Sequence, residues 1–181
     1  MTVKSVCVFT GASDRTPKHY IETAQEIGAI LGSHRYQLVY GGGGTGLMGA
    51  VSSAATQAGG HVLGITTKLL AGYEKVNTTI TEVRVVEDMH KRKHAMYDNS
   101  DAFLILPGGI GTLDECFEII TWKQLEIHNQ PILIYNYKGY WEPLKALLAS
   151  MSKEGFVKKE HVDMLHFFEK PSELLPLLQT F

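Results

Sequence analysis

The chain has 181 residues, of which 44% are hydrophobic and 20% are charged, a balance that fits one globular domain with a full-sized core. Its net charge of −2 and the lack of a basic tail exclude nucleic-acid binding through bulk electrostatic attraction. No apolar run approaches the ~18 residues of a membrane span, and we recognise no signal peptide. We therefore expect a protein that binds neither nucleic acid nor a membrane.

The two cysteines, Cys7 and Cys116, stand far apart, and each lies within an apolar run. Packing in the core is the favoured interpretation of both. Because the sequence has no CxxC pair and no disulfide framework, a reducing environment is expected, and we predict a cytoplasmic location.

Hydrophobic patterning predicts strands that alternate with helices along the chain. The predicted strands cover residues 3–9, 36–40, 61–65, 83–86, 102–106 and 132–135, with a short one near 165. The predicted helices cover 17–32, 47–58, 88–99, 113–125 and 140–151, with a last one from 172. Residues 67–80 are polar and are expected to be irregular. This alternation predicts an α/β fold, in which a single Rossmann-like domain spans residues 1–181 with helices on both faces of a mostly parallel sheet.

A run of glycines, GGGGTG at 41–46, follows the second predicted strand and precedes a helix. Glycine lets the backbone approach a phosphate closely, and a helix N-terminus offers unpaired N–H groups. A tight turn needs fewer glycines than this, so we predict a phosphate loop formed by Gly43, Gly44, Thr45 and Gly46. No Lys-Ser/Thr pair follows, which excludes a Walker A loop, and no acidic residue ends the next strand to hold a dinucleotide.

A second glycine-rich loop, PGGIGT at 107–112, also joins a strand to a helix. It continues into Thr112-Leu113-Asp114-Glu115, and this spacing has two interpretations. Thr-x-x-Glu is a capping box, with Thr112 as the N-cap and Glu115 reaching back. Alternatively, Glu115 lies one helical turn from an anion-binding loop, where its carboxylate could meet a sugar.

The predicted helix at 88–99 contains the sequence MHKRK, and a helical wheel places Arg92 and Lys93 beside its apolar stripe. Lys91 and His94 fall on the opposite, solvated face. Charges near the core need an anionic partner, and the candidates are a ligand phosphate, Glu115 and Asp114. We favour the ligand. His90 and His94 are spaced i, i+4, but no third ligand is evident, so we predict no metal site.

The segments GGGGTGLMG (41–49), MHKRK (89–93) and PGGIGTLDE (107–115) occur together in this order. The chain in this respect resembles the LONELY GUY family, the cytokinin riboside 5′-monophosphate phosphoribohydrolases, which are often mislabelled lysine decarboxylases. Members hydrolyse N6-substituted adenosine 5′-monophosphates to the free base and ribose 5-phosphate, with no cofactor. The resemblance implies that Arg92 and Glu115 are catalytic and that the substrate contacts Glu74, Arg92, Lys93, Gly109, Ile110, Gly111, Thr112, Leu113, Asp114, Glu115 and Thr121.

The chain departs from the family pattern at two turns. Gly-Ser-Ser is usual after the first strand, where this chain has Gly11-Ala12-Ser13, and Ile/Met-Pro-Lys is usual where it has Thr66-Thr67-Lys68. Both turns are expected at the rim of the pocket, so they bear on base selectivity more than on the reaction.

For the chemistry, we expect Glu115 to stabilise an oxocarbenium-like sugar or orient water, while Arg92 holds phosphate or ribose. The dipole of its helix is expected to keep Glu115 ionised. Two alternatives are a non-catalytic nucleotide or cofactor carrier on the same fold, and a pyridoxal phosphate-dependent decarboxylase, for which no Schiff-base lysine can be identified. Since the helix at 113–125 is apolar nearly all round, we also predict at least a homodimer.

Overall fold

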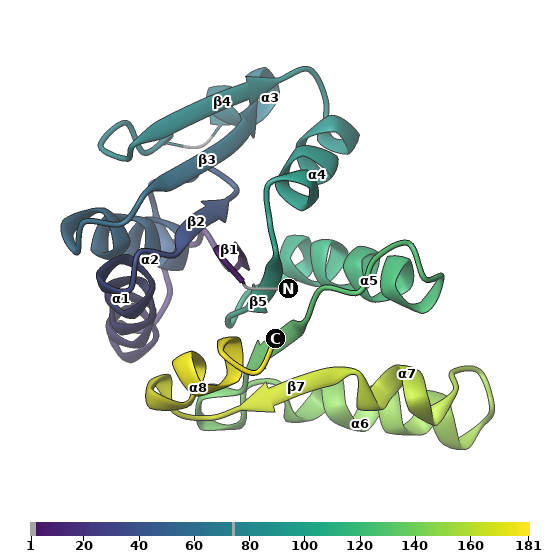
Figure 1. The fold of residues 1–181 in the computed structure, drawn as a ribbon. Helices are drawn as coiled ribbons and strands as arrows, with labels where there is room; N and C mark the ends of the chain where they lie inside the picture. Colours follow the sequence, from purple (N-terminus) through teal and green to yellow (C-terminus); the bar gives the residue numbers. More distant parts are fainter. Residues whose placement is uncertain (1–2, 74) are drawn as a thin grey trace.

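The computed structural model describes residues 3–73 and 75–181, and in these residues seven parallel strands form one sheet (Figure 1). The strand order is β4-β3-β2-β1-β5-β6-β7. The strands are β1 (Ser5–Phe9), β2 (Gln37–Tyr40), β3 (Val62–Thr67), β4 (Glu82–Val86), β5 (Ala102–Ile105), β6 (Ile132–Tyr135) and β7 (Leu165–Phe168). Each predicted strand is present, and the prediction of a Rossmann-like α/β fold is confirmed.

Helices cover both faces of the sheet, as the alternating pattern predicts. On one face lie α1 (Lys18–Ser33), α2 (Gly46–Gln57) and α8 (Leu174–Leu178), and on the other lie α4 (Met89–Asp98), α5 (Ile110–Gln124) and α6 (Glu142–Lys153). The remaining helical segments are α3 (Lys68–Tyr73), η1 (Tyr137–Gly139), α7 (Lys159–Asp163) and η2 (Pro171–Glu173). No helix in the described ranges is long and apolar enough to cross a membrane.

Two short helices, α3 and α7, differ from the sequence-based expectation. Residues 67–80 were expected to be irregular, yet their first part forms the six-residue helix α3. Neither helix has a fully buried residue, so neither carries the apolar stripe by which an amphipathic helix is recognised in a sequence.

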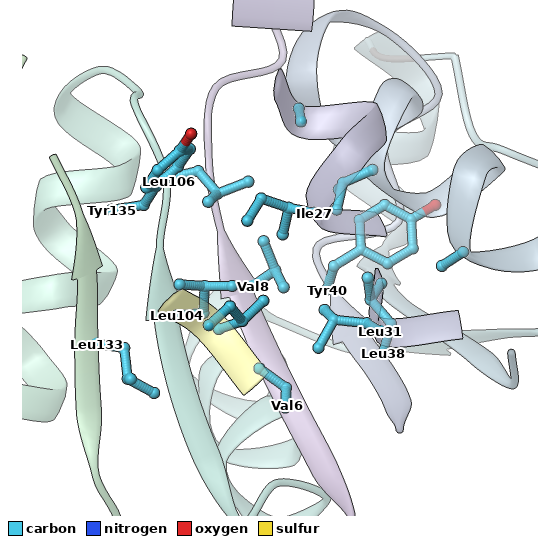
Figure 2. Packing of buried hydrophobic residues seen from close by; sticks show 14 of the residues in the cluster. Val6, Val8, Ile27, Leu31, Leu38, Tyr40, Leu104, Leu106, Leu133 and Tyr135 are labelled. Atoms are coloured by element: carbon cyan, nitrogen blue, oxygen red, sulfur yellow. The ribbon is translucent and has the colours of Figure 1, made fainter. Parts of the chain in front are cut away.

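The core lies on both faces of the central strands because successive side chains point to opposite sides. On β1, Val6 and Val8 pack beneath α1 and α2 (Figure 2), while Cys7 and Phe9 pack on the other face. Cys7 and Cys116 are both buried and unbridged, which confirms their assignment to the core.

Helices α1 and α2 lie side by side at a distance that depends on glycine (Figure 1). A Cβ atom at Gly28 would collide with the carbonyl oxygen of Val51, and one at Gly32 with that of Ala55. The close approach fixes where α2 begins, and therefore the position of the glycine loop that precedes it.

The strand order reverses between β1 and β5, because α1 leads from β1 to β2 while α5 leads from β5 to β6. At such a point the loops diverge beyond the carboxyl ends of the strands and leave a crevice for ligands. A hydrogen bond of 3.2 Å from Gly11 N to Pro107 O links the loops that follow these two strands. Both glycine-rich loops lie at this edge of the sheet.

Candidate active site

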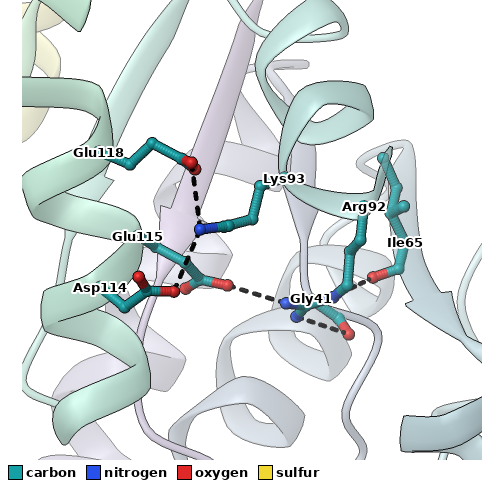
Figure 3. Close-up of polar contacts among 7 residues, drawn as sticks. All are labelled: Gly41, Ile65, Arg92, Lys93, Asp114, Glu115 and Glu118. Atoms are coloured by element: carbon teal, nitrogen blue, oxygen red, sulfur yellow. Dashed lines mark hydrogen bonds and ion pairs between the residues drawn. The ribbon is translucent and has the colours of Figure 1, made fainter. Parts of the chain in front are cut away.

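The side chain of Arg92 is buried at the carboxyl edge of the sheet and reaches three elements (Figure 3). Its Nε donates to the carbonyl of Ile65 at the end region of β3 (2.9 Å), and Nη2 donates to the carbonyl of Gly41 after β2 (3.2 Å). Its Nη1 donates to Oε1 of Glu115 on α5 at 3.0 Å. Helix α4 positions the side chain, and Asp88 caps α4 by accepting from the backbone N–H of Lys91 at 2.8 Å.

Glycine is required at position 41 by the guanidinium rather than by the backbone. A Cβ atom there would overlap Nη2 of Arg92. The first glycine of the GGGGTG run therefore makes room for the arginine, a role that the sequence alone does not indicate.

Glu115 faces Arg92 from α5, and its side chain is only 7% exposed. Helix α5 begins at Ile110 with Gly109 as its N-cap, so Thr112 is the third helical residue. The capping-box interpretation is therefore wrong, because Thr112 lies inside the helix and the Glu115 carboxylate bonds Arg92. Thr112 instead packs against Gly108, where a Cβ atom would collide with its hydroxyl.

Burial raises the pKa of Glu115 above its ordinary value, and the neighbouring Arg92 guanidinium opposes this shift. The direction of this pKa shift is opposite to the one that the helix dipole alone would produce. Glu115 is the sixth residue of α5, beyond the first turn in which the dipole acts, so desolvation outweighs it.

Lys93 lies beside this pair and bridges two carboxylates of α5 (Figure 3). Its Nζ lies 3.3 Å from Asp114 Oδ2 and 3.1 Å from Glu118 Oε1. Burial lowers the pKa of Lys93, but the hydrogen bonds and charges of Glu118 and Asp114 outweigh it and hold the pKa above its usual value. Lys91 and His94 are exposed, as the helical wheel predicts.

At the N-terminus of α2, which follows the GGGGTG loop, the backbone N–H groups largely have acceptors within the chain. The carbonyl of Gly11 accepts from Leu47 N (2.9 Å) and Met48 N (3.2 Å), the first-turn donors of α2. Gly44 N donates to Lys75 O at 2.6 Å, and the Thr45 hydroxyl donates to Ala12 O at 2.7 Å. These groups of the predicted phosphate loop therefore already have partners.

The N-terminus of α5 is different, because it faces open space. A Cβ atom at Gly109 or Gly111 would meet nothing within 4 Å. Among the residues that the structure describes, the N–H groups of Ile110, Gly111 and Thr112 have no acceptor. Three unpaired donors on glycine-rich backbone are the arrangement that anions bind.

The remaining predicted contacts are spread over α5 and its surroundings. Leu113 packs partly into the core, Ile110 is 87% exposed, and the Thr121 hydroxyl donates to Phe117 O at 2.7 Å within its own helix. Glu74 lies outside the described residues. No cluster of three or more metal-ligating side chains occurs in the ranges 3–73 and 75–181.

Comparison with known proteins identifies the family of the chain. A family model described as "Possible lysine decarboxylase" matches residues 48–178. A rice protein (Oryza sativa subsp. japonica), "Probable cytokinin riboside 5′-monophosphate phosphoribohydrolase LOGL2", is 42% identical over 178 residues, which cover 98% of this chain and 73% of that protein. The chain belongs to the LONELY GUY family.

Another member of the LONELY GUY family, from Arabidopsis thaliana, is named "Cytokinin riboside 5′-monophosphate phosphoribohydrolase LOG3" and is 41% identical over 178 residues, or 98% of this chain and 83% of that one. Among solved structures, a molybdenum cofactor binding protein from Rippkaea orientalis superposes with a TM-score of 0.74 at 18% identity, covering 99% of this chain and 98% of that one. At this identity the likeness establishes the shared fold alone.

Sequence reasoning missed two residues of this LONELY GUY site. Gly41 belongs to the GGGGTG run but not to the four residues predicted to form the phosphate loop, and nothing in the sequence pairs it with Arg92. Glu118 follows Asp114 by four residues, so a helical wheel places both on one face of α5, and that spacing could have identified it as the second partner of Lys93.

Proposed function

We propose that this protein hydrolyses the N-glycosidic bond of N6-modified adenosine 5′-monophosphates, or of AMP, to the free base and ribose 5-phosphate. The names of its relatives support this activity. The structural observation that carries the proposal is the buried Arg92–Glu115 pair, 3.0 Å apart, next to the open N-terminus of α5. A phosphate site and a carboxylate lie within one helical turn, as cleavage of a nucleoside monophosphate requires.

The 5′-phosphate is proposed to bind the N–H groups of Ile110, Gly111 and Thr112. These donors are unpaired in the described part of the chain, and Gly109 and Gly111 leave space for the phosphate oxygens. The GGGGTG loop, whose donors at Gly44 and Thr45 are already bonded, instead supports the site by holding Arg92 through Gly41.

Glu115 is proposed to stabilise the positive charge that develops on the sugar. Oε1 binds Arg92, whereas Oε2 has no hydrogen-bond partner in the described residues and remains for water or for the sugar. The ionised carboxylate lowers the energy of an oxocarbenium-like transition state and orients the attacking water. Arg92 holds this carboxylate in place and, together with Lys93, offsets the negative charge of the phosphate.

A pyridoxal phosphate-dependent decarboxylase fits this site poorly. The lysine of the site, Lys93, has a pKa above its usual value, because its pairs with Glu118 and Asp114 outweigh burial. Formation of a Schiff base requires a neutral amine. A lysine held protonated between two carboxylates is unsuited to it.

We propose further that the protein is a cytoplasmic homodimer. After α5 the chain exposes Leu125 (62%) and Ile127 (55%), and Phe117 and Trp122 are partly exposed on the helix itself. An apolar surface of this kind favours association with a second copy. The two buried, unbridged cysteines fit a reducing compartment.

Release of the free base is the measurement that tests the proposed reaction. The purified protein is incubated with AMP and a panel of N6-substituted adenosine 5′-monophosphates, and base and ribose 5-phosphate are quantified. We expect equimolar formation of both products, with a preference among N6 groups. Tight binding of the nucleotides without base release would favour a nucleotide carrier and contradict the proposal.

A further inference from the structure

The peptide between Gly108 and Gly109, just before α5, is held by a tyrosine from a distant part of the chain. The hydroxyl of Tyr140, which follows η1, donates to the carbonyl of Gly108 at 2.7 Å. The preceding carbonyl, that of Pro107, accepts from the Thr10 hydroxyl (2.9 Å) and from Gly11 N (3.2 Å). Two successive carbonyls of the PGGIGT loop therefore accept hydrogen bonds from other parts of the chain.

The bond from Tyr140 determines where the next N–H group points. Because a peptide bond is planar and trans, the N–H of Gly109 points away from the carbonyl of Gly108 and from Tyr140. This N–H has no acceptor in residues 3–73 and 75–181, and it immediately precedes the three unpaired donors of α5. A peptide between two glycines meets little steric resistance to rotation, so an outside contact is needed to hold it in one orientation.

Tyr140 is itself fixed by aromatic neighbours. Its ring packs edge-on against Tyr20, with centroids 5.6 Å apart, and against Trp141 at 4.9 Å. Burial raises the pKa of the hydroxyl above its usual value, so it remains a donor across the physiological range. Tyr140 and Gly109 both line a cavity of about 230 Å³ between the loops after β1 and β5. A Cβ atom at Gly109 would meet nothing within 4 Å, so the chain leaves room for a ligand beside this peptide.

We propose that Tyr140 is a positioning residue for the phosphate site: by bonding the carbonyl of Gly108, it aims the N–H of Gly109 at the phosphate as a fourth backbone donor. This inference rests on the proposed function, because the phosphate is that of the nucleoside monophosphate. It adds a residue from beyond β6 to a site that otherwise consists of residues from β2–α2, α4 and α5.

The test removes only the hydroxyl, in the variant Tyr140→Phe, which keeps the ring and its packing. The matched control is Tyr137→Phe, in the same aromatic cluster, because the Tyr137 hydroxyl makes no hydrogen bond within the described residues. For wild type and both variants, KM and kcat are measured with an N6-substituted adenosine 5′-monophosphate and with the corresponding riboside. Binding of ribose 5-phosphate is measured by calorimetry.

We expect Tyr140→Phe to weaken ribose 5-phosphate binding and to raise KM for the monophosphate roughly five- to tenfold, the range for loss of one oriented hydrogen bond. The kcat, the residual activity on the riboside and the melting temperature should stay close to wild type, as should every property of Tyr137→Phe. Unchanged phosphate affinity in Tyr140→Phe, or an equal loss in Tyr137→Phe, overturns this inference alone. A wild-type protein that binds no ribose 5-phosphate overturns the proposed function and the inference with it.

Discussion

Nη2 of Arg92 occupies the space in which a side chain at position 41 would lie, and it donates to the Gly41 carbonyl at 3.2 Å. The position of the Arg92 side chain thus depends on the absence of a methyl group at residue 41, in the turn between β2 and α2. The two positions act as one unit in the structure, although 51 residues separate them in the chain.

Replacing Gly41 with alanine should therefore disable Arg92 without changing it. The new methyl group displaces the guanidinium from both the Gly41 carbonyl and Glu115, and we expect turnover to fall by roughly two decades, as when one charged contact of a transition state is removed. Steady-state kinetics with the monophosphate measure the effect. Gly72→Ala is the matched control, because a Cβ atom there meets nothing within 4 Å; normal turnover in Gly41→Ala would contradict the prediction.

Glu115→Gln should abolish most of the activity and also lower the melting temperature. A capping-box residue would tolerate glutamine, but the carboxylate here is the buried partner of Arg92. Loss of the charge at the sugar costs about 3–4 kcal/mol, or two to three decades in turnover. Breaking a buried ion pair costs up to about 3–5 kcal/mol of stability, moderated here because the amide still accepts a hydrogen bond.

Two measurements on Glu115→Gln separate these effects. Thermal unfolding gives the melting temperature, and turnover is then measured well below that temperature, where the variant is folded. A folded variant with near-normal turnover would remove Glu115 from the chemistry. It would direct the search for the catalytic carboxylate to Glu74 or Glu118.

Gly111→Ala should weaken substrate binding while slightly raising the stability of the fold. Alanine is favoured over glycine inside a helix by about 1 kcal/mol, and its methyl group meets nothing within 4 Å, so the melting temperature should rise slightly. The same methyl group occupies the space proposed for a phosphate oxygen, and KM for the monophosphate should rise about tenfold or more. Gly72→Ala in α3 is again the control. An unchanged KM would place the phosphate elsewhere.

The acid limb of the pH–rate profile should lie above the ordinary carboxyl range. Because burial raises the pKa of Glu115, its carboxylate takes up a proton at a higher pH than the reference value of 4.5. The proton removes the charge that stabilises the sugar cation, so kcat should fall as the pH drops through the raised pKa. A kcat profile recorded on the acid side measures this limb, and loss of the limb in the residual activity of Glu115→Gln would assign it.

The association of subunits can be tested on the exposed apolar residues after α5. Light scattering of the wild type should give at least twice the monomer mass of 20.1 kDa. Leu125→Glu places a charge on the proposed interface and should shift the protein toward monomer. Leu69→Glu is a matched control, because Leu69 on α3 is also 62% exposed. A wild type that remains a monomer at micromolar concentration would refute the dimer.

The sequence predicts the sheet, its helical layers and the main site residues because periodicity and glycine-rich turns are local signals. Arg92 could be placed near the core from its position on a helical wheel. The sequence favours a ligand phosphate over Glu115 as its partner, whereas the structure bonds it to Glu115, because that choice depends on how closely α4 and α5 approach across the sheet edge. The Tyr140–Gly108 bond joins positions 32 residues apart and leaves no periodic trace.

The carbonyl of Gly11 occupies the N-terminus of α2 much as a bound anion would, since it accepts from both Leu47 and Met48. The GGGGTG loop is also tied to the segment after α3 through the Gly44–Lys75 bond and through the bond from Asn77 N to Gly42 O, of 3.1 Å. Hydrogen bonds within the chain itself therefore hold this half of the crevice. Little further ordering of these loops is therefore needed when a substrate binds, so the entropic cost of binding on the protein side is small here.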